Sequence, residues 1–303
     1  MTKVERVQIN QDLSFSRIIQ GLWRLNEWPL SDEGLLSLIE KCLELGITTF
    51  DHADIYGGYQ NEALFGKALA LKPSIREKIE LVTKCGIKLV SKARPEHKIK
   101  HYDTSKEHIM MSVENSLRNL EADYLDVLLI HRPDPFIDPG EVAEAFTRLN
   151  EAGKVKHFGV SNFTPSQFEM LNSYLPFPLV TNQIEISVSQ LQPFQDGTID
   201  QCLQKRVAPM AWSPLAGGAI FSGEDEKSVR IKKALQEVGE ELGIAEIDKI
   251  MLAWLLLHPA KIMPIIGSGK MERIKAAAES LQIALTRQQW FKIWIASTGK
   301  DVA

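Results

Sequence analysis

Four short apolar runs in this sequence each end on a polar residue that could take part in hydride or proton transfer. The terminal residues are Asp51, Lys84, His131 and Ser213. Segments with the composition of helices separate the runs, and strands that alternate with helices along a chain indicate a parallel sheet. When such a sheet closes into a barrel, catalytic side chains lie at the carboxyl ends of its strands. The sequence therefore predicts an active site built from strand ends.

Asp51, Tyr56, Lys84 and His131 could together reduce a carbonyl group. Reduction needs an acid that protonates the developing alkoxide, and a tyrosine with its ordinary pKa of about 10 is a weak acid at about pH 7. An ammonium group lowers that pKa, so we expect Lys84 beside Tyr56, with Asp51 holding Lys84 in place. His131 would orient the carbonyl oxygen. Singly, a strand-end aspartate is more often a turn residue and a lysine a solvated charge, so the prediction rests on the set.

The composition is typical of a soluble globular protein. The chain has 303 residues, 44% of them hydrophobic, and a formal net charge of −4. This length suits one α/β barrel, and we expect a single domain over 1–303. The mild negative charge argues against nucleic-acid binding. Three widely spaced cysteines, with neither a signal peptide nor a membrane-spanning stretch, favour a cytoplasmic protein.

Hydrophobic periodicity and capping residues predict the elements that would position these residues. An alternating stretch at 4–19 reads as a hairpin. We expect eight strands, near 18–22, 47–50, 79–84, 125–130, 155–160, 179–184, 207–212 and 262–266. Helices are expected at 31–45, 62–71, 229–242, 246–257 and 286–296, and three more after capping boxes that begin at Thr104, Asp138 and Thr164. Residues 85–103 should form an excursion at the barrel mouth and 214–228 a glycine-rich loop. The last helix would close the bottom of the barrel or lean on its mouth.

Several short motifs, in order along nearly the whole chain, resemble those of the aldo-keto reductases. They are Phe-Asp-His-Ala-Asp-Ile-Tyr-Gly at 50–57, the isolated Lys84, Leu-Leu-Ile-His ending at His131, Gly-Val-Ser-Asn at 159–162, Asn-Gln-Ile-Glu at 182–185 and Trp-Ser-Pro-Leu at 212–215. The resemblance implies a (β/α)8 TIM barrel with an N-terminal β-hairpin and a C-terminal helix. It also implies an NADPH-dependent oxidoreductase that reduces aldehydes or ketones, without a Rossmann fold. In agreement, no G-x-G-x-x-G motif follows any expected strand.

The resemblance also assigns roles to individual residues. The catalytic tetrad of the family falls on Asp51, Tyr56, Lys84 and His131, with Tyr56 as the general acid. In that family the nicotinamide carboxamide is held by residues that match Ser161, Asn162 and Gln183, and an aromatic residue, here Trp212, stacks on the ring. The pyrophosphate would lie at Ser213, Leu215, Gly217 and Gly218, since amides of a glycine-rich loop suit an anion. The adenine end would lie at Gly267, Ser268, Lys270 and Arg273, whose charges favour NADPH over NADH.

The sequence departs from the family pattern at three places. His52 replaces a threonine, and its ring could point toward the tetrad or sideways. Ala276 and Ala277 replace a Glu-Asn pair that contacts adenine in the family. We therefore expect weaker binding of the cofactor. Trp212 stands where tyrosine is more common.

Other functions remain possible from the sequence. Lys84 could form a Schiff base in a lyase, or the chain could be a cofactor-bound regulatory subunit. His97 and His101 could share a metal on a helix, but no third ligand is evident nearby, so we expect a solvated basic face and no metal site. The expected partner is a small carbonyl substrate, with Trp23 and Trp28 in its pocket, and not a membrane. A monomer or weak oligomer is expected.

Overall fold

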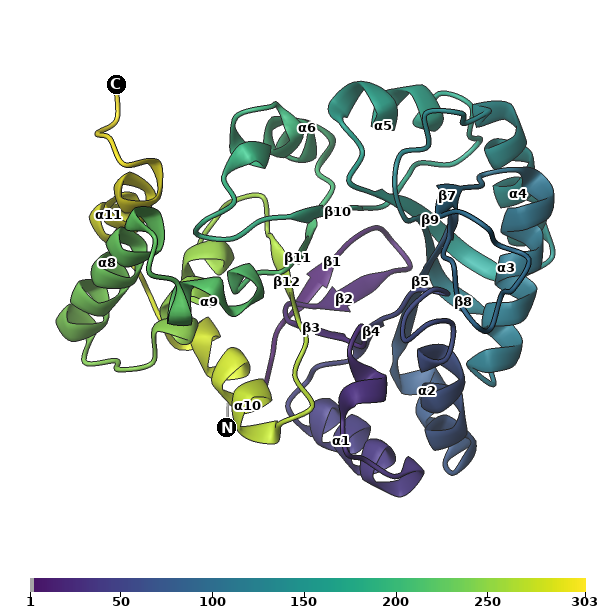
Figure 1. Cartoon of the computed structure of the whole chain (residues 1–303), viewed down its shortest axis with the longest axis horizontal. Coiled ribbons are helices and arrows are strands. Elements are labelled where there is room, and N and C mark those ends of the chain that lie inside the picture. The colour runs from purple at the N-terminus through teal and green to yellow at the C-terminus, as the bar shows by residue number, and fades with distance from the viewer. Residues whose placement is uncertain (1–2) are drawn as a thin grey trace.

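Eight parallel strands close into a barrel in the computed structural model, which describes residues 3–303 (Figure 1). Each strand pairs with its neighbours along the chain, and the last pairs with the first. The prediction of a (β/α)8 barrel is therefore confirmed. The barrel strands are β3 (Ile19–Gly21), β4 (Thr49–Asp51), β5 (Glu80–Cys85), β8 (Leu125–Ile130), β9 (Val155–Ser161), β10 (Asn182–Glu185), β11 (Met210–Trp212) and β12 (Met263–Ile266).

Helices form the outer layer because each carries one apolar stripe. In α1, for example, Leu35, Leu38, Ile39 and Cys42 are buried at helical spacing. The α-helices are α1 (Asp32–Glu44), α2 (Asn61–Ala70), α3 (Lys106–Asn119), α4 (Pro139–Glu151), α5 (Pro165–Asn172), α6 (Thr198–Lys205), α7 (Ala219–Ser222), α8 (Glu226–Leu242), α9 (Ile247–Leu256), α10 (Met271–Glu279) and α11 (Arg287–Thr298). Short 3₁₀ helices are η1 (Leu25–Glu27), η2 (Pro73–Lys78), η3 (Gln192–Phe194), η4 (Ala216–Gly218) and η5 (Ser280–Gln282).

The N-terminal hairpin closes the end of the barrel at which the strands begin. It consists of β1 (Arg6–Gln8) and β2 (Ser14–Ser16), and Figure 1 shows it across the centre of the ring. Phe15 is fully buried and belongs to a cluster with the inward side chains Val82, Val127 and Met210. This apolar plug leaves the opposite end, at the carboxyl ends of the strands, for polar side chains.

Two of the three predicted capping boxes differ from expectation. Ser105, and not Thr104, caps α3 by accepting a hydrogen bond from the amide of His108, because the Thr104 hydroxyl donates to Asp134. Asp138 caps α4, but the side chain of Glu141 accepts from the amide of Lys106 on another helix. The third box, at Thr164, has both reciprocal bonds.

The last helix neither closes the bottom of the barrel nor leans on its mouth. α11 packs on α8 and α9, at the outer edge of the molecule in Figure 1. The Trp290 and Trp254 rings stack with centroids 4.6 Å apart, and each indole N–H donates to the backbone carbonyl of the other residue. Aromatic stacking and paired hydrogen bonds therefore place this helix against the outside of the barrel.

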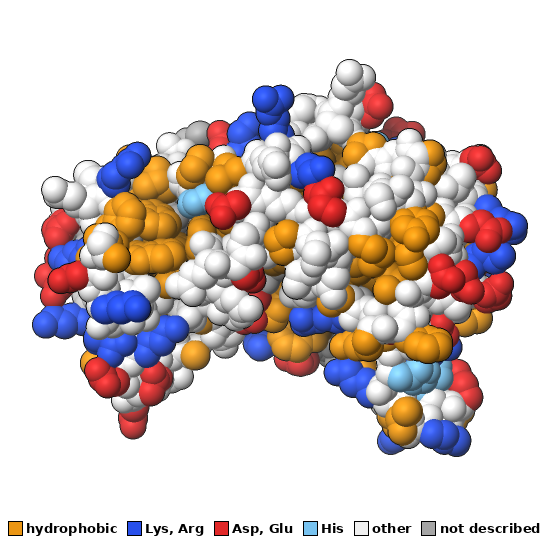
Figure 2. All heavy atoms as spheres, turned by 90° about the horizontal axis from the view of Figure 1, so that it is seen from above, with side chains coloured by type: hydrophobic (Ala, Val, Ile, Leu, Met, Phe, Trp, Pro, Cys, Tyr) orange, Lys and Arg blue, Asp and Glu red, His pale blue; other side chains and the backbone are white. Residues whose placement is uncertain are grey.

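Two connecting segments contain more regular structure than expected. The excursion at 85–103 contains the antiparallel strands β6 (Ile87–Lys88) and β7 (His101–Tyr102). The loop expected at 214–228 includes η4, α7 and the first turn of α8. On the face drawn in Figure 2, acidic and basic side chains are interspersed. Within residues 3–303, no helix has the length and apolar character needed to cross a membrane.

Candidate active site

Asp51 and Lys84 point into the barrel from two neighbouring strands. Alternation along β4 turns Phe50 outward against Phe65 of α2 and Asp51 inward. Along β5 the same alternation turns Thr83 outward to Glu62 and Lys84 inward. The Lys84 ammonium lies 2.9 and 2.8 Å from the two Asp51 carboxylate oxygens. Both side chains are almost fully buried, so the strand pattern itself forms this ion pair.

Tyr56 reaches Lys84 from the turn that follows β4. Its hydroxyl oxygen lies 3.1 Å from the Lys84 Nζ, which also donates to the backbone oxygen of His52 at 2.6 Å. Gly57 follows with a φ of +59°, and a Cβ at this position would lie 1.9 Å from the Asn61 side-chain oxygen. The turn therefore requires glycine, as the sequence there suggests.

His131 completes the group directly after β8. Its backbone amide donates to the carbonyl of Cys85 at 2.9 Å, which fixes the residue at the barrel mouth. Its ring lies edge-on to the Tyr56 ring, with centroids 5.8 Å apart. The structure therefore brings together all four residues that the sequence suggested as a set.

The electrostatics of the group differ from the simple expectation. Burial raises the pKa of Tyr56 above its ordinary value, because it outweighs the opposing effect of the nearby Lys84 ammonium. The expected net lowering of this pKa by Lys84 is thus wrong. Burial opposes the charge of Lys84, but Asp51 and Tyr56 outweigh it and raise the pKa of Lys84. Burial, together with Lys84 and Arg132, holds the pKa of His131 well below its ordinary value, so its imidazole is neutral.

His52 points away from the tetrad. Its ring lies between the barrel wall and α2, edge-on to Phe65 with centroids 4.6 Å apart. Burial, with Lys84, lowers the pKa of His52 to about 3. The neutral ring packs as part of the wall, and only the backbone carbonyl of His52 contacts Lys84.

A second set of polar side chains lies at the ends of β9, β10 and β11. The Asn162 amide donates to the Ser161 hydroxyl at 2.7 Å, and Ser161 donates to the backbone carbonyl of Gln183 at 2.9 Å. The Trp212 indole donates to the Asn162 side-chain oxygen at 2.9 Å. Asn162 has a φ of +61°, a conformation that asparagine tolerates better than most residues. These four residues therefore form one connected cluster at the barrel mouth.

Arg132 belongs to the same mouth. Its guanidinium carbon lies 5.2 Å from the centroid of the Trp212 ring. Arg132 directly follows His131 after the end of β8, and this position places both residues at the mouth.

The loop after β11 has an open backbone. Ser213, Ala216, Gly217 and Gly218 all have positive φ values, between 50° and 91°. At Gly217 and Gly218 an added Cβ would meet nothing within 4 Å. Backbone amides in loops of this kind can bind an anion, but the amide of Gly218 donates to the carbonyl of Leu215 at 2.9 Å.

The segment before α10 lies beside Trp28. The Ser268 side chain accepts from the amide of Lys270, and Gly267 has open space around it. Gly269 packs so closely on Trp28 that a Cβ would lie 2.5 Å from the indole. Trp28 therefore supports the segment expected to bind adenine, whereas Trp23 is 60% exposed. Their role in a substrate pocket stays a prediction.

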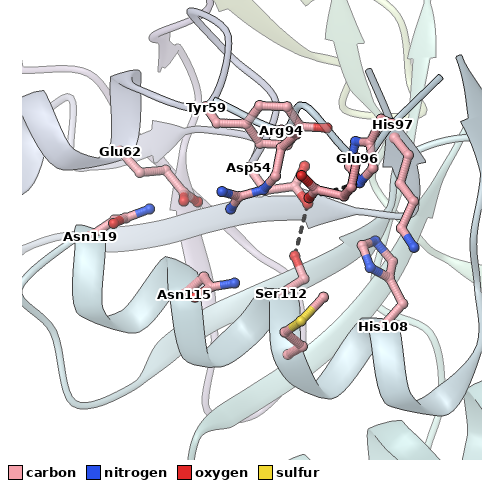
Figure 3. Close-up of a pocket in the computed structure, with 12 residues that line it drawn as sticks. Asp54, Tyr59, Glu62, Arg94, Glu96, His97, His108, Ser112, Asn115 and Asn119 are labelled. Atoms are coloured by element: carbon pink, nitrogen blue, oxygen red, sulfur yellow. Dashed lines mark hydrogen bonds and ion pairs between the residues drawn. The ribbon is translucent and has the colours of Figure 1, made fainter. Parts of the chain in front are cut away.

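A cavity of about 300 Å³ lies outside the tetrad, between the excursion, α2 and α3 (Figure 3). Asp54 accepts from Ser112 there at 2.8 Å. Burial, with the nearby Glu62, raises the pKa of Asp54 to about 8. His97 lies on the same wall. Its ring is edge-on to the His101 ring, with centroids 6.1 Å apart. Among residues 3–303, no three His, Cys, Asp or Glu side chains are grouped so that they could hold a metal ion.

Comparisons with known proteins agree with this architecture. The model of the aldo/keto reductase family matches residues 17–296. The chain is 59% identical to the uncharacterized oxidoreductase YcsN of Bacillus subtilis, over 99% of this chain and 100% of that protein. It is 46% identical to a 6-dehydroglucose reductase of Agrobacterium fabrum, over 99% and 100% of the two chains. A solved structure of the thermostable aldo-keto reductase Tm1743 superposes with a TM-score of 0.81 at 27% identity, covering 96% of this chain and 99% of that one.

Proposed function

The chain belongs to the aldo/keto reductase family, and we propose that it is an NADPH-dependent enzyme that reduces an aldehyde or ketone to an alcohol. One observation carries the proposal. The buried Lys84 ammonium lies between the Asp51 carboxylate and the Tyr56 hydroxyl, and His131 lies beside the phenol. This arrangement can donate a proton to a carbonyl oxygen at the mouth of the barrel.

The side chains around the tetrad fit a nicotinamide cofactor, which enzymes of this family use. Ser161, Asn162 and Gln183 offer hydrogen-bonding groups at the strand ends, where the carboxamide would bind. The backbone at Gly217 and Gly218 carries no side chain and has open space beside it, so a pyrophosphate could approach closely. When bound, the cofactor supplies the hydride.

Lys270 and Arg273 support NADPH in particular. Lys270 stands at the N-cap position of α10, and its side chain makes no capping bond. A helix N-terminus and two cations suit the additional phosphate group that distinguishes NADPH from NADH. The proposed preference for NADPH therefore depends on these two residues.

The chain's own residues account for the proton transfer. Tyr56 keeps its proton at neutral pH, because the ordinary pKa of tyrosine is about 10 and burial raises the pKa of Tyr56 further. When Tyr56 gives that proton to the substrate oxygen, the Lys84 ammonium stabilises the phenolate left behind. The neutral His131 imidazole supplies a hydrogen bond to the same oxygen. Asp51 keeps Lys84 charged and in position.

The same geometry supports a reductase over a Schiff-base lyase. A lysine that forms a Schiff base must be a neutral amine at the moment of attack. Lys84 instead donates to Asp51, His52 and Tyr56, and its pKa is raised. Borohydride trapping of a carbonyl compound on Lys84 would contradict this assignment.

We further propose that the substrate is a hydroxylated aldehyde of the sugar type. Two relatives, 46% and 37% identical, are named 6-dehydroglucose reductases. In this chain, Arg132 at the mouth offers several N–H donors to the hydroxyl groups of a sugar. Replacing Arg132 with methionine should lower kcat/KM for 6-dehydroglucose about tenfold or more. It should change kcat/KM for a small apolar aldehyde much less, and equal losses for both would contradict the proposed role.

The Tyr56→Phe variant tests the proposed function and separates it from that of a cofactor-bound regulatory subunit. We expect this variant to bind NADPH as the wild type does, measured by quenching of tryptophan fluorescence, but to lose turnover of aldehydes. NADH should quench at higher concentration than NADPH. A wild-type protein that retains NADPH tightly yet reduces none of a broad panel of aldehydes would support the regulatory alternative instead.

A further inference from the structure

Gln183 forms a hydrogen bond across the interior of the barrel. Its side-chain nitrogen lies 2.7 Å from the Asp51 Oδ1, and both residues are almost fully buried. Gln183 is on β10 and Asp51 is on β4, which stand opposite each other in the order of the closed barrel. The bond therefore connects two strands on opposite sides of the barrel that share no ladder hydrogen bonds.

This bond completes the set of donors around Asp51. The Lys84 ammonium donates to both carboxylate oxygens, and Gln183 is the second donor to Oδ1. Lys84 has three N–H donors for four acceptors, because the His52 carbonyl and the Tyr56 hydroxyl also lie 2.6 and 3.1 Å from its nitrogen. The position of Asp51 thus determines how Lys84 is shared with the phenol, and Gln183 restrains Asp51 from the far wall.

The backbone of Gln183 connects to the other cluster of the site. Its carbonyl oxygen accepts from the Ser161 hydroxyl and from the backbone amide of Asn162, each at 2.9 Å. Gln183 therefore contacts both parts of the site. Its main chain contacts the cluster that is proposed to hold the carboxamide, and its side chain contacts the proton-donating group. Connected polar networks of this kind transmit a change at one member to the others.

We propose that Gln183 is a positioning residue for proton transfer, in addition to any contact with the cofactor. It holds Asp51 so that Lys84 stays within hydrogen-bonding distance of Tyr56. The cofactor contact rests on the proposed function, whereas the link to Tyr56 exists in the protein without cofactor. Because coupling between two sites is reciprocal, occupation of the carboxamide site would also change the ionisation of Tyr56.

The Gln183→Met variant tests this link, since methionine has a similar length and cannot donate to Asp51. With tyrosines labelled with carbon-13 at Cζ, the Tyr56 resonance can be assigned among the five by its loss in Tyr56→Phe. In the cofactor-free protein, we expect the resonance to shift in Gln183→Met and the pKa of Tyr56 to rise, because Asp51 then draws Lys84 away from the phenol. At saturating NADPH and aldehyde, kcat should fall about tenfold, as for loss of one hydrogen bond to a charged group.

Gln201→Met is the matched control. Gln201 is also a buried glutamine, and its amide donates to Pro165 and Glu169 on the outside of the barrel. This variant should leave the Tyr56 resonance unchanged. If Gln183→Met does not fold, Gln183→Leu also lacks a donor to Asp51, and it should raise the pKa of Tyr56 in the same way.

Two results would overturn the proposal. The first is that the Tyr56 resonance and its titration in cofactor-free Gln183→Met are the same as in the wild type, even if NADPH binds this variant more weakly. The other is an equal shift in both methionine variants, which would indicate general loosening. If the wild-type protein reduced no carbonyl compound, the proposed function would fail, but the resonance of the cofactor-free protein would still test the Gln183 link.

Discussion

Lys84 is the residue on which the site depends, because its hydrogen-bond partners Asp51, His52 and Tyr56 lie at the end of β4 and in the turn that follows. Its ion pair with Asp51 is buried, and breaking such a pair by removing one partner costs about 3–5 kcal/mol. Lys84→Met should therefore lower both stability and turnover. The Asp51→Asn/Lys84→Met double variant should recover most of the stability and none of the turnover.

Urea denaturation and aldehyde turnover of the single and double variants separate the two effects. Recovery of turnover in the double variant would show that Lys84 acts only through the fold. A double variant no more stable than Lys84→Met would show instead that the pair does not carry the stability.

Asp54 makes stability depend on pH in an unusual direction. Its pKa rises from an unfolded value of about 3.9 to about 8 in the folded protein, so the folded state binds the proton more tightly. The unfolded state binds fewer protons between these values, and the free energy of unfolding therefore falls as pH rises from about 4 to about 8. Asp54→Asn should not lose stability in this way. The free energy of unfolding of the variant, relative to that of the wild type, should therefore increase between about pH 4 and about pH 8.

Asp103 provides a control of opposite sign for the same measurement. Burial opposes its charge, but hydrogen bonds from Lys88 and Ser105 lower the pKa of Asp103 to about 2. Its stabilisation is present above about pH 4 and is lost as pH falls toward 2. Asp103→Asn should thus lower stability at neutral pH. An Asp54→Asn profile parallel to that of the wild type from pH 4 to 8 would contradict the assigned ionisation.

At the scale of elements, the turn between β4 and α2 determines where the proton donor lies. Gly57→Ala would place a Cβ against the Asn61 side chain, which also anchors the turn by donating to the carbonyls of Leu22 and Trp23. We expect kcat for aldehyde reduction to fall at least tenfold, with NADPH binding nearly unchanged.

Gly153→Ala is the control for that prediction. Gly153 also has a positive φ, but an added Cβ there meets nothing within 4 Å. Both variants carry the backbone strain of alanine in this conformation, and only Gly57→Ala adds the collision. Equal kcat in the two variants would refute the role assigned to the turn.

The sequence predicts the elements well where a local pattern determines them. The barrel strand at 125–130 is apolar except for Asp126, and its bounds agree with β8. β11 begins three residues later than expected, since the amide of Val207 is used by the end of α6 and Pro209 has no amide hydrogen. Ser105 replaced Thr104 as a cap because a tertiary partner, Asp134, takes the Thr104 hydroxyl. Such partners depend on the fold and leave no local signal.

At the scale of the whole molecule, the barrel and the C-terminal helix have separate roles. α11 packs on α8 and α9, on the outside of the barrel, and the Trp290–Trp254 stack joins the layers. Trp290→Ala should lower the free energy of unfolding by about 3 kcal/mol, measured by urea denaturation. Under native conditions kcat should remain within about twofold of the wild type, and a larger loss would contradict this separation.

The candidate site was predictable as a set of residues, and less so in its energetics. The spacing of Asp51, Lys84 and His131 at strand ends follows from barrel topology, so the sequence suffices to bring them together. Burial of Tyr56 could not be read from the sequence, and it reversed the expected direction of its pKa. The contact of Gln183 with Asp51 joins opposite strands, and only the closed barrel reveals it.

Hydride transfer itself is the most direct test of the proposed enzyme. The protein would be incubated with NADPH carrying deuterium on the transferable position of the nicotinamide and with 6-dehydroglucose, and the alcohol analysed by mass spectrometry. We predict deuterium at the former carbonyl carbon with the wild type and no labelled product with Tyr56→Phe. Unlabelled alcohol from the wild type, or equal labelling by both proteins, would contradict the account.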